Sequence, residues 1–92
     1  MARWGLLVHK DLGGNVPGLV EVLDEVDGTR EEAEERMRHH IRYYNPRHPT
    51  SPKRKRLYRT ADGWLLVGDG AFGRSYPYHF RVCELEWDSA AK

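Results

Sequence analysis

The chain has little sulfur and no long hydrophobic run. One cysteine among 92 residues cannot form an internal disulfide, which favours a reducing compartment and leaves the apolar core to hold the fold. No apolar stretch approaches the ~18 residues of a membrane span, and the first residues lack the pattern of a signal peptide. A chain of this length predicts one domain over residues 1–92, with no membrane partner.

The chain also has almost no net charge, which argues against a protein that is basic throughout. Lys and Arg number 15 against 14 Asp and Glu, for a formal charge of +1. The charges are unevenly placed, because residues 45–59 carry six basic side chains and no acidic one. The rest of the chain therefore carries −5. Such asymmetry bears on partners rather than on fold.

Hydrophobic periodicity predicts an α+β domain. Residues 3–10 and 18–26 alternate like strands and are separated by a Gly-Gly loop, which predicts a hairpin. A helix is expected over 29–44, where Thr29 and Glu32 have the spacing of a capping box. Further strands are predicted at 54–60, 64–67 and 78–87, with a tight turn at 61–63 and a Gly-rich loop at 68–77.

The predicted fold is thus one helix packed on a mainly antiparallel sheet, in the element order ββαβββ, which is the order of β-grasp-like domains. The helix carries a narrow apolar stripe suited to one face of a sheet. The last predicted strand changes parity, which predicts a β-bulge near residues 82–83. Its inward side chains are first Tyr78, Phe80 and Val82, then Cys83, Leu85 and Trp87.

Aromatic residues are concentrated in the predicted strands. Their simplest interpretation is a set that fills a small core. The alternative is an exposed platform, with Tyr43, Tyr58 and Tyr76 near the basic segment. The first interpretation covers Trp4, Trp64, Phe72, Tyr76, Tyr78, Phe80 and Trp87.

The basic segment is the strongest functional candidate. Prolines at every third position predict an extended, Pro-rich basic connection over 45–53, and residues 88–92 are expected to be a flexible tail. Clustered cations with a tyrosine can contact phosphates and stack on a base. The opposing interpretation is a basic edge strand protected from unwanted pairing. The candidate nucleic-acid-binding residues are Arg47, Lys53, Arg54, Lys55, Arg56, Tyr58 and Arg59.

Metal and enzyme chemistry find weaker support. His39 and His40 are adjacent on the predicted helix and point ~100° apart, so they cannot both bind one metal ion. We therefore expect no metal or cofactor. His40 is interpreted as a residue at the edge of the core. His79 and Cys83 lie ~13 Å apart along one strand, too far for a nucleophile and its base. Gly68 to Gly73 match Gly-x-Gly-x-x-Gly but lack a following helix pattern. We therefore expect no catalytic residues.

Three segments carry a resemblance. Residues 3–8, residues 28–33 and the stretch from Tyr44-Asn45-Pro46 to Arg59 are similar to small uncharacterised proteins of high-GC actinobacteria. The resemblance would span most of the chain and implies a bacterial cytoplasm, without an assigned activity. It argues against a nuclear-import role for the Pro52–Arg56 run.

Two functions follow as expectations. The first is a small non-enzymatic binding or regulatory module that contacts an anionic partner, most simply nucleic acid, through residues 47–59. The alternative is a protein–protein adaptor or homodimer that uses a sheet edge and exposed aromatics.

Overall fold

The structure is a computed structural model that describes residues 2–10, 18–44, 54–69 and 75–90. It has one helix and five strands in the predicted order, so the α+β fold class is confirmed. The elements are β1 (Arg3–Lys10), β2 (Leu19–Asp27), α1 (Arg30–Arg42), β3 (Arg54–Thr60), β4 (Gly63–Asp69) and β5 (Ser75–Glu84).

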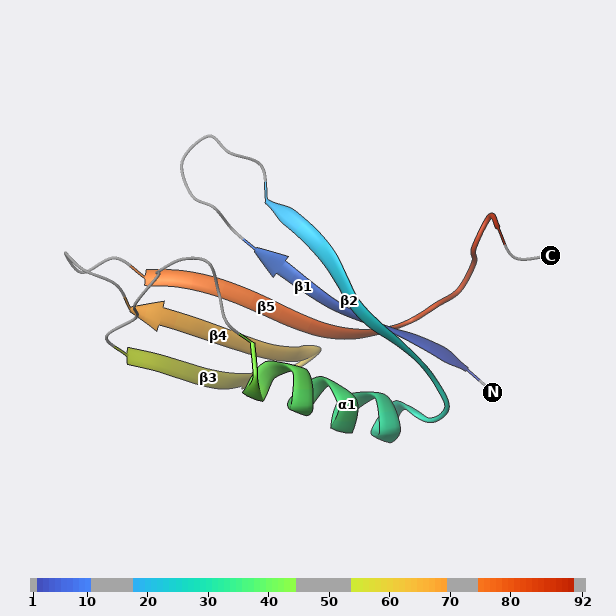
Figure 1. Ribbon diagram of the computed structural model, residues 1–92, viewed down its shortest axis with the longest axis horizontal. Coiled ribbons are helices and arrows are strands. Elements are labelled where there is room, and N and C mark those ends of the chain that lie inside the picture. The colour runs from blue at the N-terminus through green and yellow to red at the C-terminus, as the bar shows by residue number, and fades with distance from the viewer. Residues whose placement is uncertain (1, 11–17, 45–53, 70–74, 91–92) are drawn as a thin grey trace.

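The strands form one antiparallel sheet in the order β2-β1-β5-β4-β3. Both predicted hairpins are present, since β1 pairs with β2 and β3 pairs with β4. β1 and β5 come from opposite ends of the chain and lie side by side within the sheet, as Figure 1 shows. The single helix lies on one side of this sheet (Figure 1), and it is too short and too polar to span a membrane.

The last two strands differ in extent from the sequence prediction. β4 and β5 stay paired as far as Asp69 opposite Ser75, so both strands continue into the stretch 68–77 that was predicted to be a loop. β5 therefore begins before Tyr78, and it ends at Glu84 rather than Trp87. Backbone pairing between neighbours, which sequence periodicity does not report, sets these limits.

The helix begins as its sequence predicts. The Thr29 hydroxyl accepts the Glu32 amide N–H at 3.1 Å, and the Glu32 carboxylate accepts the Thr29 amide N–H at 3.2 Å, which completes the capping box. Gly28 precedes the cap at φ +152°, a backbone conformation that residues with a side chain rarely adopt. The turn from β2 into α1 thus depends on Gly28 and Thr29.

The core lies between the helix and the middle of the sheet. Ala33, Met37 and Ile41 form the buried stripe of α1, as predicted. They belong to one cluster with side chains from the helix-facing side of β1, β4 and β5. Those strand residues are Leu6, Val8, Trp64, Leu66, Tyr78, Phe80 and Val82.

The predicted bulge in the last strand is wrong. The register between β1 and β5 runs without a shift as far as Glu84, whereas β2 carries a bulge, since Leu6 pairs with Asp24 and Leu7 with Val22. β5 therefore keeps strict alternation. Its first apolar set faces the helix, and the second set lies on the opposite face of the sheet and is exposed: Cys83, Leu85 and Trp87.

A polar contact ties the helix to the edge strand β2. Asp24 accepts a hydrogen bond from His40 Nε2 at 2.9 Å and pairs with Arg36 at 3.1 Å. The hydrogen bond from His40, together with the Glu25 amide and the Arg36 charge, lowers the pKa of Asp24. His40 is a hydrogen-bonded residue at the core edge, as interpreted from the sequence.

Replacing Gly63 by alanine should strongly destabilise the fold. A Cβ at Gly63 would overlap the Phe80 carbonyl oxygen of the neighbouring strand, so β4 and β5 could not keep their spacing. We expect Gly63→Ala to lower the free energy of unfolding by about 3 kcal/mol or more. Gly5→Ala is the matched control, because its Cβ would meet atoms no closer than 3.6 Å. Urea titrations of both variants check this, and equal losses would contradict it.

Replacing Asp24 by asparagine should cost stability in a pH-dependent way. A carboxylate with a lowered folded pKa stabilises the fold above the unfolded pKa, and this contribution is lost as pH falls through the folded value. Asp24→Asn should lower the free energy of unfolding by about 1 kcal/mol at neutral pH. The difference in this free energy between the variant and the native protein should narrow below about pH 4. Unfolding titrations at neutral and acidic pH measure both. The control is Glu31→Gln, at an exposed carboxylate with no basic side chain within 4 Å among the described residues. A stability difference between Asp24→Asn and the native protein that stays constant with pH would refute the assignment.

Candidate interaction surface

The predicted basic segment does not form one surface. Arg54 to Thr60 are a strand, so successive side chains point to opposite faces of the sheet. Lys55 and Arg59 share the helix-facing side with Leu57. The opposite face takes Arg54, Arg56 and Tyr58, which pair with Asp69, Val67 and Leu65 of β4. Arg47 and Lys53, the other two candidates, lie outside the described residues.

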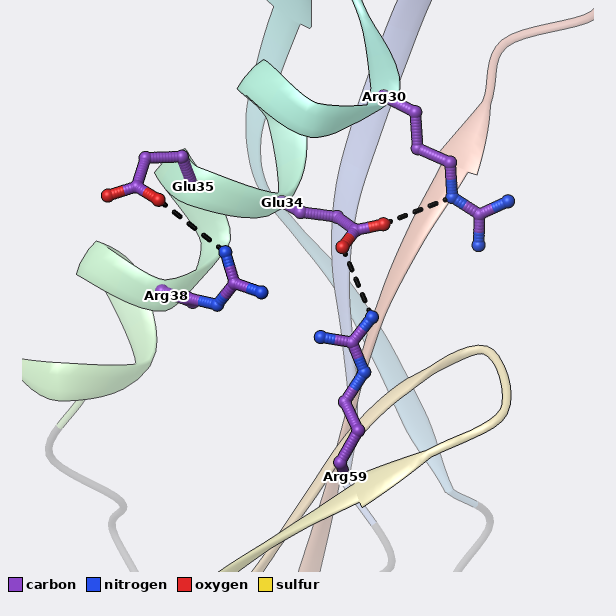
Figure 2. A network of polar contacts seen from close by, with 5 residues as sticks. All are labelled: Arg30, Glu34, Glu35, Arg38 and Arg59. Atoms are coloured by element: carbon purple, nitrogen blue, oxygen red, sulfur yellow. Dashed lines mark hydrogen bonds and ion pairs between the residues drawn. The ribbon is translucent and has the colours of Figure 1, made fainter.

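Arg59 is neutralised by the acidic helix. Its guanidinium contacts the Glu34 carboxylate at 3.1 Å and lies 4.5 Å from the centre of the Trp64 ring. Figure 2 shows Glu34 held between Arg59 and Arg30, with the Glu35–Arg38 pair beside it. The hydrogen bond from Arg59 lowers the pKa of Glu34. Arg59 thus closes the edge of the core while it is paired with Glu34.

Arg56 is also engaged within the chain. It donates to Asp69 at 3.0 Å and to the Tyr58 hydroxyl at 3.0 Å. The hydrogen bond to Asp69 raises the pKa of Arg56. Among the described candidates, Arg54 and Lys55 are the cations with no carboxylate within 4 Å in the described part of the chain.

The face of the sheet that lies away from the helix carries apolar side chains. One row crosses all five strands and is set by the strand register: Val20, His9, His79, Leu65 and Tyr58. Val20 is 64% exposed and Tyr58 46%. The two imidazoles at the middle of the row have ring centres 6.2 Å apart. Nothing in the described chain covers this row.

We call the side of the sheet that lies away from the helix the open face. Besides the row described above, it includes Leu7 and Val67, which are half-buried, and Val22, which is exposed. Beyond Leu7 it deepens into a groove of about 450 Å³, lined by Gly5, Leu7, Val22, Cys83, Leu85 and Trp87. Arg3, Glu25, Glu84 and Glu86 complete its lining.

Trp87 marks the largest departure from the predicted core. It was assigned to the core with the other aromatics, but it is 78% exposed beside the groove. Trp64, Tyr78 and Phe80 are buried as predicted, and Trp4 and Tyr76 pack against the core. Phe72 lies outside the described residues. Cys83 is likewise exposed, although it was expected among the inward side chains of the last strand.

Metal or catalytic groups do not converge in the described residues. No three His, Cys, Asp or Glu side chains there are arranged to hold a metal ion. Cys83 lines the groove, but Asp69 instead contacts Arg56 and the Ser75 hydroxyl. His79, Cys83 and Asp69 are therefore not assembled around this groove.

Comparisons with known proteins add no further assignment. No family model matches the chain, and neither a curated protein nor a solved structure is significantly similar to it. The resemblance to small actinobacterial proteins therefore stays a prediction.

Sequence reasoning missed the open face, although one signal for it was present. The change of parity along the last strand was read as a bulge in a strand with one apolar side. In the structure the apolar side chains of β5 that join the core are Tyr78, Phe80 and Val82, whereas Cys83 points to the other side of the sheet and is exposed. Leu85 and Trp87 follow the end of β5 and line the groove on that same side, which is why the inward set seemed to change parity.

Proposed function

We propose that this protein is a small non-catalytic protein-interaction module whose open face binds another polypeptide. The observation that carries the proposal is the apolar surface opposite the helix, which ends in a groove beside an exposed tryptophan. Exposed apolar patches with a polar border are typical of protein interfaces. This proposal corresponds to the alternative function expected from the sequence, a protein–protein adaptor or homodimer, but it uses the open face of the sheet in place of a sheet edge.

The charges around the open face support a protein partner over nucleic acid. Arg3 is paired with Asp27 at 2.9 Å, Arg81 with Asp62 at 3.1 Å, and Arg56 with Asp69 at 3.0 Å. Cations that are already paired attract phosphates weakly, because binding releases few counterions. An apolar centre with self-compensated ions around it suits a polypeptide surface better.

A photo-crosslinking amino acid placed at Val22 should capture a polypeptide. Val22 is 57% exposed at the centre of the apolar side of β2, so a bound partner would lie within reach. Illumination in cells of the organism that encodes the protein should give heavier covalent adducts on denaturing gels. The same group at Glu31, an exposed position on α1, is the control. Adducts that are absent, or equally abundant from both positions, would contradict the proposal.

Contact with a nucleic acid through Arg54 and Lys55 is the second candidate. It is favoured by one observation, that these two exposed cations have no carboxylate partner among the described residues. Two phosphate contacts would give a slope of log K against log salt of about −2 on duplex DNA.

A titration with duplex DNA and single-stranded RNA at two salt concentrations tests this second candidate. If it holds, Arg54→Glu combined with Lys55→Glu abolishes binding, because both phosphate contacts become repulsive. Arg42→Glu, on the exposed end of α1, should bind as the native protein does after allowance for net charge. No binding at low salt, or an equal loss from both variants, would exclude the candidate.

A further inference from the structure

We infer that the groove at the end of the open face binds a basic segment of the partner polypeptide, with an apolar side chain over Gly5 and a lysine or arginine beside Trp87. This inference rests on the function proposed above, and it names the chemistry of the partner at one site. It follows from the shape of the groove, from its exposed indole ring and from the surplus of carboxylates around it.

The glycine at position 5 gives the groove its depth. Gly5 lies in β1 between β2 and β5, where its register partners are Glu25 and Cys83. A Cβ on Gly5 would have Leu7 Cδ2 at 3.6 Å and the Cys83 carbonyl oxygen at 3.8 Å as its nearest described neighbours. Both are ordinary van der Waals distances. The space above Gly5 is therefore open, and a side chain of a partner can fill it.

The walls of the groove are largely apolar. Leu7, Val22, Leu85 and Trp87 line it, and Val22 and Trp87 are mostly exposed. The volume of about 450 Å³ falls within the range of about 300–1,000 Å³ that is usual for ligand sites. An apolar side chain in the groove would remove these walls from water, which favours binding. Because Leu7 also belongs to the open face, a segment bound in the groove can continue across that face.

Carboxylates outnumber cations beside the groove. Arg3 contacts Asp27 at 2.9 Å and Glu25 at 4.0 Å. The hydrogen bond to Asp27 and the negative charges of Asp27, Glu25 and Asp88 raise the pKa of Arg3. One guanidinium thus lies among three carboxylates, and this end of the sheet carries surplus negative charge.

The end of β5 adds to this surplus. Glu84 and Glu86 border the groove, and neither has a basic partner within 4 Å among the described residues. The register places Glu84 opposite Trp4, on the side of the sheet that faces the helix. Its charge therefore acts on a ligand at a distance rather than by contact. Such attraction extends over about 8–10 Å in physiological salt, so it guides a basic segment to this end of the sheet.

An exposed tryptophan near carboxylates is suited to a basic side chain. The face of an indole ring attracts the cation of lysine or arginine more strongly than other aromatic rings do. The chain itself shows this contact at Trp64, where Arg59 and Arg38 lie 4.5 and 5.6 Å from the ring centre. Trp87 has no such cation over it among the described residues. A lysine or arginine of the partner can take that place.

The surplus of carboxylates favours this occupant over others. A nucleic acid or an acidic peptide would bring negative charge to a site that already has too much of it, which costs binding energy. A basic peptide gains from the same charges, while its apolar side chain gains from the walls of the groove. Both parts of the site are then used by one ligand.

A library of random twelve-residue peptides, selected for binding to the purified protein, tests the inference. Peptides that bind should be enriched in lysine or arginine next to a large apolar residue. The affinity of the best peptide should fall as salt rises, because the cations are attracted by charge. An enrichment of acidic or uncharged peptides, or no enrichment, would overturn the inference.

Substitutions in the groove should weaken the best basic peptide, measured by the fluorescence anisotropy of a labelled copy. Glu25→Lys reverses a charge and Trp87→Ala removes the indole ring, and both side chains are exposed, so the fold should persist. Each should raise the dissociation constant at least about tenfold. Gly5→Leu should do the same by filling the floor of the groove.

Matched controls make the same changes elsewhere. Glu31→Lys reverses an exposed charge on α1, and Tyr43→Ala removes an exposed aromatic ring at the end of that helix. Both should bind the peptide within about twofold of the native protein. Unchanged affinity in the groove variants, or equal losses in the controls, would overturn the inference.

The outcome also separates this inference from the proposed function. If the Val22 probe captures a polypeptide in cells but no basic peptide is enriched, the inference fails and the proposed function stands. If the probe captures nothing and no peptide is enriched, both fail.

Discussion

The packing of one short helix against one side of a five-stranded sheet is the constraint on which the rest of the structure depends. A helix of 13 residues is about 20 Å long and about 10 Å across, so it covers only part of one face. Ala33, Met37 and Ile41 seal the middle strands, and Phe80 is fully buried beneath them. The opposite face receives no helix from the described chain, and it exposes apolar side chains among paired charges.

Charged side chains complete the side that the helix covers. Arg59 and Arg38 lie over Trp64, at 4.5 and 5.6 Å from its ring, where the helix does not reach far across β4. Glu34 and Glu35 hold these two arginines in place, and Asp24 binds His40 and Arg36 at the other side of the helix. The acidic residues of α1 and β2 therefore serve the fold. Much of the near-zero net charge consists of pairs made within the chain.

The sequence predicted the fold well because the local signals are strong and agree with one another. The capping box at Thr29 and Glu32, the apolar stripe of α1 and the pairing of strands that are neighbours in sequence are short-range features, and each one is present. The candidate site was predicted less well, because the exposure and pairing of each basic side chain depend on its neighbours across the sheet. Alternation along β3 divides the basic segment between two faces, and Glu34 and Asp69 come from distant parts of the chain. Cys83 and Trp87 are exposed because they lie on the side of the sheet away from the helix, and no single segment encodes which side the helix will cover.

The sheet presents apolar residues on both sides, and the proposed function holds that the open face is where another polypeptide binds. The reactivity of the native Cys83 thiol tests this claim most directly, since this exposed side chain lines the groove and needs no substitution. If another polypeptide covers the face, the Cys83 thiol should be labelled more slowly in intact cells than in the purified protein, and denaturant should restore fast labelling. A labelling rate that is equally fast in intact cells and in the purified protein would contradict the claim.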